Sequence, residues 1–183
     1  PEGRVLKVIG LIAEGHGIGL SIGSLCRLKD NGVDILAEVV GFNEDRVLLM
    51  PYGNTTGLKP GCRILLVDSS PKADVGNALL GRVVDGMGHP LDGKGPVLTD
   101  RQYPLYGEGI NPMDRVPIRE KMDVGIAAIN SLITLGRGQR IAIMAGSGVG
   151  KSILMGMMTK HTEADVTVIG LVGERGREVL DFI

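Results

Sequence analysis

The stretch "AGSGVGKS", Ala145–Ser152, decides how the second half of the chain folds. From its second position onward it follows the pattern G-x-x-x-x-G-K-[ST] of a phosphate-binding loop, the P-loop or Walker A motif. The glycines let the backbone curl so that N–H groups point at phosphate oxygens, and the N-terminus of a following helix adds a positive dipole end. The predicted phosphate-binding residues are Gly146, Ser147, Gly148, Val149, Gly150, Lys151, Ser152 and Ile153.

Two side chains of this loop carry specific chemistry. Lys151 supplies a positive charge for the β- and γ-phosphates, and Ser152 supplies a hydroxyl for Mg²⁺. Ala145 stands where the motif has its first glycine, at a cost of about 1 kcal/mol if that position needed a positive φ. The alternative is a glycine-rich connection that binds nothing, which the complete G-K-S ending and the flanking segments disfavour.

The segments around the loop alternate between strand and helix patterns. The runs "RIAIMA" (140–145) and "VTVIGLVG" (166–173) are short and apolar, as buried parallel strands are, and "KSILMGMMTKHT" (151–162) has apolar pairs four residues apart. A second helix is predicted before Gly136, with an apolar face made of Met122, Ile126, Ile129 and Ile133. This order of strands and helices predicts an α/β domain.

A charged stretch, "GERGRE", follows the second predicted strand. By itself such a stretch is a solvated turn that opens a helix. Because ligands of open α/β sheets lie at the carboxyl ends of the strands, Glu174 and Arg175 are expected to face the same crevice as Lys151. A carboxylate there orients or deprotonates an attacking water, which contributes about 10² to 10⁴ in rate. An arginine there neutralises charge on a transferred phosphoryl group.

The first seventy residues have a different sequence pattern. Short runs rich in Val, Ile and Leu cover residues 4–14, 23–28, 33–42, 46–52 and 62–67. Turn signals rich in Gly, Asn, Asp and Pro separate these runs, and Asn31-Gly32 is a hairpin signal. Regular short strands without a helical period predict a small closed β-barrel; the alternative is a sandwich edge detached from a larger sheet.

A change of composition near Lys72 marks the predicted domain boundary. Residues 1–71 are assigned to the barrel and residues 72–183 to the first part of the nucleotide-binding domain. The segment 71–117 is dense in turns and prolines. The alternatives are a pure linker and a segment with at least one strand, which the apolar residues Leu79, Leu80, Val83 and Val84 suggest.

Composition and charge exclude several functional classes. The net charge of −1 provides no basic excess for binding nucleic acid, and no apolar run approaches the ~18 residues of a membrane span. Cys26 and Cys62 lie in apolar stretches and are predicted to be small buried hydrophobes of a reducing compartment. The cytoplasm is therefore the expected location.

Taken together, these motifs resemble the ATPases of bacterial type III protein export. "AGSGVGKS" with "TEADVTVIGLVGERGREV" carries the likeness most specifically, and "NPMDRVPIREKM" resembles the flagellar branch, with the injectisome branch as the alternative. The family is similar to the catalytic subunit of rotary ATP synthases. The resemblance implies a small N-terminal β-barrel followed by the beginning of a RecA-like P-loop domain. It also implies a homohexamer with sites between subunits.

By the same resemblance, particular residues and partners acquire roles. Lys151 and Ser152 match the phosphate and Mg²⁺ residues, Glu174 matches the general-base glutamate, and Arg175 the arginine beside it. The implied ligands are ATP and Mg²⁺. The implied partners are export-apparatus and stalk proteins, export substrates and their chaperones, at the cytoplasmic face of the inner membrane.

The resemblance further implies that the chain is an N-terminal fragment. The Walker-B aspartate, the intersubunit arginine finger and the adenine-contacting aromatic of the family lie beyond Ile183. An arginine finger is worth about 10³ to 10⁵ in rate, so residues 1–183 alone are expected to lack turnover. Two other functions stay open: a nucleotide-binding subunit without hydrolysis, which Glu174 disfavours, and an interaction module that assembles through its barrel.

Overall fold

The computed structural model describes residues 2–17, 19–146, 148–174 and 176–182. It divides into two compact units, Pro1–Gly109 and Ile110–Ile183.

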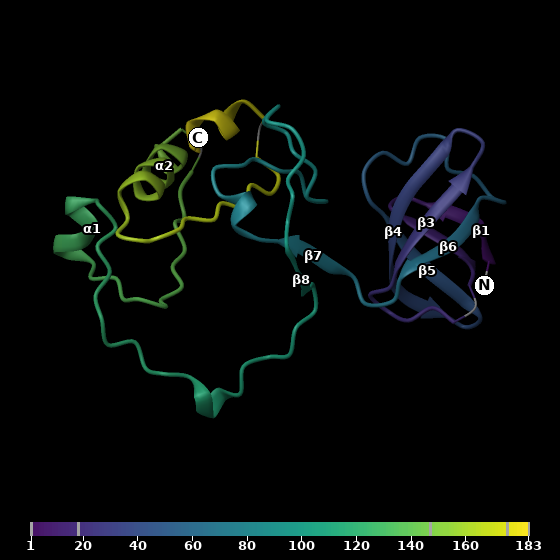
Figure 1. Ribbon diagram of the computed structural model, residues 1–183, viewed down its shortest axis with the longest axis horizontal. Helices are drawn as coiled ribbons and strands as arrows, with labels where there is room; N and C mark the ends of the chain where they lie inside the picture. Colours follow the sequence, from purple (N-terminus) through teal and green to yellow (C-terminus); the bar gives the residue numbers. More distant parts are fainter. Residues whose placement is uncertain (1, 18, 147, 175, 183) are drawn as a thin grey trace. The chain divides into compact units, whose positions relative to one another are not determined.

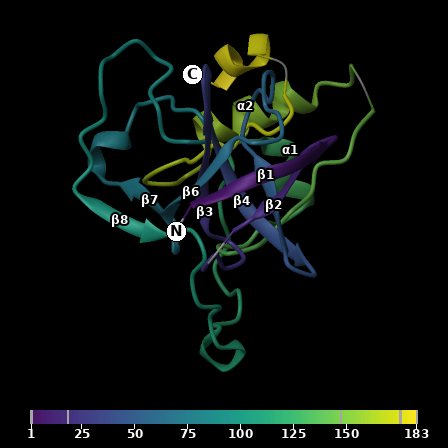
Figure 2. The same ribbon diagram turned by 90° about the vertical axis from the view of Figure 1, so that its right-hand side faces the viewer.

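A closed six-stranded antiparallel barrel forms the first part of the chain (Figure 1; Figure 2 shows it from a second direction). The strands follow one another around the barrel in the order β1-β2-β5-β4-β3-β6. Their bounds are β1 Glu2–Ile9, β2 Ile12–His16, β3 Leu25–Asp30, β4 Val33–Asn43, β5 Arg46–Pro51 and β6 Arg63–Asp68. The predicted β-barrel is confirmed.

The core of the barrel follows from the alternation of the strands. Every second residue of a strand points inward, so that Val, Leu, Ile, Ala and Cys side chains from all six strands or their ends meet inside. The buried core consists of Val5, Ala13, Cys26, Leu28, Ala37, Val39, Val47, Leu49, Cys62 and Ile64. Each large aliphatic member stabilises the fold by about 1.5–3 kcal/mol. Both cysteines are free and buried, as predicted.

The turns differ from the sequence-based expectation at one place. The apolar run 4–14 was expected to contain one strand, but a turn at Gly10 (φ 58°) divides it into β1 and β2. The left-handed φ explains the break, because a glycine adopts it without steric cost. The hairpin predicted at Asn31-Gly32 is confirmed, since Asp30 pairs with Val33 across it.

The segment after the barrel forms a two-stranded sheet of its own. Strand β7, Lys72–Val75, pairs with β8, Arg101–Pro104, and a short 3₁₀ helix η1, Asn77–Leu79, follows β7. At least one strand was expected in this segment, and it contains β7 and β8. The apolar residues that suggested it, from Leu79 to Val84, form no ladder; an isolated bridge joins Val84 and Pro90. The many glycines of this stretch favour tight turns over a ladder.

A hydrogen bond between Tyr106 and Glu38 attaches this segment to the barrel, and Tyr52 of the barrel binds the same carboxylate. The Tyr106 hydroxyl, just after β8, donates a hydrogen bond to Oε1 of Glu38 on β4. The Tyr52 hydroxyl donates to Oε2 of the same carboxylate at 2.6 Å. The two bonds, from Tyr106 first, hold the pKa of Glu38 below its usual range. Burial, and then the bond to Glu38, raises the pKa of Tyr52.

The boundary between the two units therefore lies further along the chain than composition indicates. The last barrel strand ends at Asp68, close to the expected boundary, but the units divide after Gly109. The segment 72–109 groups with the barrel. The assignment of 72–183 to one nucleotide-binding domain stays a prediction.

The described residues of the second unit form two α-helices and two 3₁₀ helices. These are η2 Pro112–Asp114, α1 Ala127–Leu132, α2 Lys151–His161 and η3 Gly176–Phe182. Helix α2 is confirmed almost residue for residue. The helix predicted from Met122 is shorter than expected, because Gly125 has φ 70° and a left-handed residue cannot continue a helix.

Two predicted strands of this unit do not form. Within the part of the chain that the structure describes, 140–145 and 166–173 are in no ladder. Parallel strands exist only when neighbouring strands pair with them and helices cover both faces. Neither condition is met here, since Met144 is 90% exposed and Val168 is 90% exposed.

Candidate nucleotide site

The phosphate-binding loop turns sharply at two glycines. Gly148 has φ 80° and Gly150 has φ 94°, both in the left-handed region that favours glycine. Gly150 is the N-cap of α2, so the loop passes directly into the first turn of that helix. A carbon atom added at either glycine would meet open space. The glycines are therefore required by backbone conformation, and the space beside them is free for a ligand.

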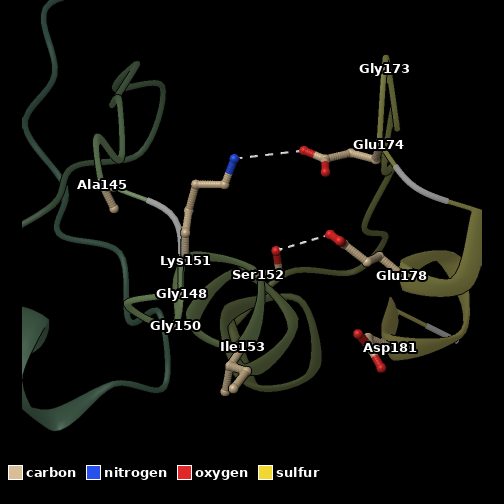
Figure 3. Close-up of a pocket in the computed structure, with 11 residues that line it drawn as sticks. Ala145, Gly148, Gly150, Lys151, Ser152, Ile153, Gly173, Glu174, Glu178 and Asp181 are labelled. Carbon is tan, nitrogen blue, oxygen red and sulfur yellow. Dashed lines mark hydrogen bonds and ion pairs between the residues drawn. The ribbon is translucent and has the colours of Figure 1, made fainter.

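An open cavity of about 760 Å³ lies between this loop and the segment around η3 (Figure 3). Such a volume is within the range of small-molecule sites. The lining residues are Ala145, Gly146, Gly148, Gly150, Lys151, Ser152, Ile153, Gly173, Glu174, Glu178 and Asp181.

Lys151 and Glu174 face each other across the cavity. The Lys151 Nζ atom lies 3.6 Å from Oε1 of Glu174, and Figure 3 shows the two side chains pointing toward one another. Their side chains are 39% and 35% exposed, so the pair adds little stability. The expectation that the two residues share one crevice is met in this geometry, although the strands expected to place them do not form.

Ser152 makes a second contact across the cavity. Its hydroxyl donates a long, weak hydrogen bond to Oε2 of Glu178 at 3.4 Å, compared with about 2.5–3.0 Å for a typical O–H···O bond. Glu178 and Asp181 were not predicted as site residues. Both residues lie on η3, which follows Glu174 in the chain and brings their carboxylates to the cavity, and no local sequence pattern indicated this.

The described side chains that line the cavity are mainly negative. Among the side chains that the structure describes there, Glu174, Glu178 and Asp181 carry carboxylates and Lys151 carries the ammonium group. A polyphosphate without a counter-ion would be repelled by this set. A triphosphate that brings a divalent cation is a better match for it.

The residues present fit a Mg²⁺ ion that is shared with phosphates. A hydroxyl and a carboxylate, from Ser152 and Glu178, are the hard oxygen ligands that Mg²⁺ prefers, and Mg²⁺ keeps most of its shell for water and phosphate oxygens. Within the described ranges, no group of three or more His, Cys, Asp or Glu residues could hold a metal by itself. The donor set thus suits a metal that arrives with a nucleotide.

The remaining predicted residues are placed as follows. Gly146 and Ile153 line the cavity, whereas Val149 is 68% exposed and is not among the lining residues described. Ser147 and Arg175 lie outside the described residues. Ala145 lines the cavity. In the described part of the chain, Glu44 is the non-glycine residue with a positive φ. Ala145 therefore has a negative φ and carries no strain of the left-handed kind.

Comparison with known proteins gives the family. Residues 5–66 match the beta-barrel domain of the ATP synthase alpha/beta family, and residues 125–183 match its nucleotide-binding domain. The chain belongs to the ATP synthase alpha/beta family. The two matched ranges contain the barrel and the phosphate-binding loop with its cavity.

Relatives within this family include flagellum-specific ATP synthases and a type 3 secretion system ATPase. The chain is 48% identical to the flagellum-specific ATP synthase of Pseudomonas aeruginosa, with 100% of this chain and 41% of the relative covered. It is 52% identical to that of Bacillus subtilis, with 99% and 42% covered. It is 44% identical to the type 3 secretion system ATPase of Xanthomonas euvesicatoria, with 99% and 41% covered. The chain thus spans about two fifths of the length of these relatives.

Solved structures of the same family have the same fold. The assembled ATPase EscN of the enteropathogenic E. coli type III secretion system has a TM-score of 0.89 and 38% identity, over 98% of this chain and 43% of that chain. EscN in complex with its central stalk EscO has a TM-score of 0.83, also at 38% identity, over 98% and 44% of the two chains. Both branches of export ATPases are therefore among the relatives, and the two are not separated by these comparisons.

None of the helices formed by the described residues has both the length and the apolar composition needed to cross a bilayer.

Proposed function

We propose that the protein is an ATPase that drives type III protein export, in the flagellar export apparatus. The observation that carries the proposal is the Lys151–Glu174 geometry: a phosphate-loop lysine and a carboxylate from a distant segment meet in one cavity, 3.6 Å apart. A cation for phosphate and a base for water are the two groups that hydrolysis of a phosphoanhydride requires.

In this proposal each residue of the site has one task. The N–H groups of the loop from Gly146 to Ile153 and the Lys151 ammonium bind the β- and γ-phosphates. Glu174 accepts a proton from, or orients, the water that attacks the γ-phosphorus. Arg175, whose role rests on the family resemblance, neutralises charge on the phosphoryl group.

Ser152 holds the metal in the same scheme. Its hydroxyl takes a position in the Mg²⁺ shell, and Glu178, at 3.4 Å from that hydroxyl, orients it. When bound, Mg²⁺ supplies positive charge to the phosphate oxygens. The negative lining of the cavity supports a requirement for the metal, because the carboxylates disfavour a bare triphosphate.

The proposed assembly is a homohexameric ring with sites shared between subunits. EscN, which was solved as an assembled ATPase and in complex with its central stalk EscO, supports a ring and a stalk partner. Export-apparatus proteins, export substrates and chaperones complete the proposed partners. The proposed location is the cytoplasm, peripheral to the inner membrane, with no nucleic acid involved.

Two other functions have specific support. Relatives of the secretion branch favour an injectisome ATPase, and restoring motility or secretion in strains that lack one or the other ATPase would separate the branches. A nucleotide-binding assembly module without hydrolysis is compatible with the closed barrel, but it gives no role to a carboxylate facing Lys151.

The proposal is tested by the rate of ATP hydrolysis against protein concentration, on the full-length protein. A shared-site oligomer predicts a rate that rises more than linearly with concentration. Lys151→Ala removes the phosphate-binding charge and is expected to abolish turnover. Lys160→Ala removes an equal charge at the other end of α2 and serves as the control. Turnover that is unchanged in Lys151→Ala would sink the proposal.

A further inference from the structure

The C-terminal end of α2 rests against a glycine. Helix α2 has 11 residues, a length of about 16 Å, and it carries Lys151 and Ser152 in its first turn. The last residue of the helix, His161, lies very close to Gly125. A carbon atom added to Gly125 would overlap the Cβ atom of His161 and would lie 2.6 Å from the His161 carbonyl oxygen. No side chain fits between the helix end and this residue, so the contact fixes how far α2 extends in that direction.

Hydrogen bonds hold the segment around Gly125 in shape. The Asp123 carboxylate accepts from the Gly125 backbone N–H at 2.7 Å and from the Asn130 side-chain amide at 2.6 Å. The Asn130 side-chain oxygen in turn accepts from the Val124 N–H at 3.2 Å. These bonds connect the turn at Gly125 to helix α1, which contains Asn130. The bond from Gly125, followed by that from Asn130, keeps the pKa of Asp123 below its usual range.

The chain beyond α2 is tied to the same segment. The Glu163 N–H donates a hydrogen bond to the backbone oxygen of Asp123 at 2.9 Å. Val124 is 4% exposed and Leu135 is 8% exposed, so the contact lies in the best-packed part of this unit that the structure describes. A displaced helix end would have to break this bond and open that packing.

A second contact holds α2 at its middle. Gly156 is the buried residue of the helix, and an added carbon there would lie 3.4 Å from the backbone oxygen of Asp181 in η3. Helix α2 therefore touches the segment that carries Glu178 at one point and the Gly125 turn at another. A helix is stiff over three turns, so a shift at His161 is transmitted to Lys151.

We propose that Gly125, Asp123 and Asn130 are positioning residues of the phosphate site. They form a seat for the C-terminal end of α2, and through the helix they set where Lys151 and Ser152 stand. None of them touches a ligand in this scheme. The inference rests on the proposed nucleotide site for its functional consequence, whereas the seat itself is a statement about the packing of α2.

The test compares two glycines that have the same backbone strain. Gly125 has φ 70° and Gly138 has φ 88°, so alanine is strained at both, but only Gly125 is crowded; an added carbon on Gly138 meets open space. In the full-length protein, Gly125→Ala is expected to weaken Mg·ADP binding about tenfold, since small misplacements of binding groups are costly. Gly138→Ala is expected to stay within about twofold of the parent, and equal affinities in the two variants would overturn the proposal.

The affinities are measured by calorimetry at a temperature well below each variant's unfolding midpoint. At such a temperature nearly all of the protein is folded, so a substitution that only lowers stability leaves the measured affinity unchanged. Asn130→Ala provides a second route if Gly125→Ala does not fold, because it removes two hydrogen bonds of the seat without a clash. It is expected to weaken Mg·ADP binding in the same direction. An affinity equal to that of the parent would overturn the proposal.

Hydrogen exchange of the α2 amides separates the seat from the nucleotide site. If the parent protein fails to bind Mg·ADP, the proposed function fails and the seat is judged by exchange alone. Faster exchange over 157–162 in Gly125→Ala than in Gly138→Ala would support the seat. Equal exchange in the two variants would overturn it, whatever the nucleotide results.

Discussion

The hydroxyl of Ser152 donates a hydrogen bond to Glu178, with 3.4 Å between Oγ and Oε2 and 26 positions between the two residues. Ser152 comes from the first turn of α2 and Glu178 from η3. The bond therefore joins the phosphate-binding loop to the segment that also carries Glu174. A metal ligand whose orientation is fixed by a second residue loses affinity when that residue is changed.

Glu178→Gln is expected to raise the Mg²⁺ concentration needed for half-maximal nucleotide binding by about tenfold, because amide and carboxylate differ in charge at the metal. The measurement is a Mg²⁺ titration of ADP binding in the full-length protein. ADP binding without Mg²⁺ should be no weaker in the variant than in the parent, because the variant lacks one carboxylate that repels the phosphates. An unchanged Mg²⁺ midpoint would contradict this role of Glu178.

The attachment of Tyr106 to Glu38 gives a prediction for the segment 72–109. Tyr106→Phe removes a hydrogen bond between this segment and the barrel, so amide exchange of β8 is expected to become faster. Tyr103→Phe is the control, because Tyr103 lies on β8 itself and is 66% exposed. Equal exchange in the two variants would show that the bond does not hold the segment.

The same contact has a defined pH dependence. Hydrogen bonds from Tyr106 and Tyr52 lower the pKa of Glu38 in the folded state. A lowered pKa contributes stability that is present above the unfolded value of about 4.3 and is lost as the pH falls through the folded value. The difference in amide exchange of β8 between the parent and Tyr106→Phe should therefore be largest at neutral pH and become smaller in acid. A difference that grows on acidification would contradict the assignment.

A nearly buried ion pair stabilises the loop between β7 and β8. Arg82 Nε lies 2.7 Å from Oδ2 of Asp92, and the side chains are 12% and 7% exposed. Arg82→Ala leaves the carboxylate without its charge partner and is expected to lower the unfolding midpoint by about 5 °C or more. Arg101→Ala breaks an exposed pair at 3.8 Å and should shift the midpoint by no more than about 1 °C.

We expect truncation of a side chain in the barrel core to cause the largest loss of unfolding free energy. Leu49 is fully buried, so Leu49→Ala is expected to cost about 2–5 kcal/mol of unfolding free energy, from lost burial and a cavity. Leu11 is 76% exposed, and Leu11→Ala should change the same quantity by about 0.5 kcal/mol or less. Urea unfolding of the two variants measures both, and similar losses would contradict the observed core.

The sequence predicts local features of this protein better than distant contacts. The alternation of apolar residues was sufficient to predict the barrel, and the pattern of glycines was sufficient to predict the loop before α2. The strands expected at 140–145 and 166–173 depend on neighbours that no local pattern contains. The bond between Tyr106 and Glu38 joins residues 68 positions apart, and Glu178 became visible as a site residue only once η3 had placed it beside Ser152.

The most direct test of the proposed ATPase is Glu174→Gln in the full-length protein, with nucleotide binding and turnover measured on the same sample. The account predicts that Mg·ATP still binds, because Lys151 and Ser152 are intact, while turnover falls by about 10² to 10⁴. Turnover near that of the parent would contradict the role of Glu174 as the base. Binding without turnover in the parent itself would exclude hydrolysis and leave a nucleotide-binding assembly module.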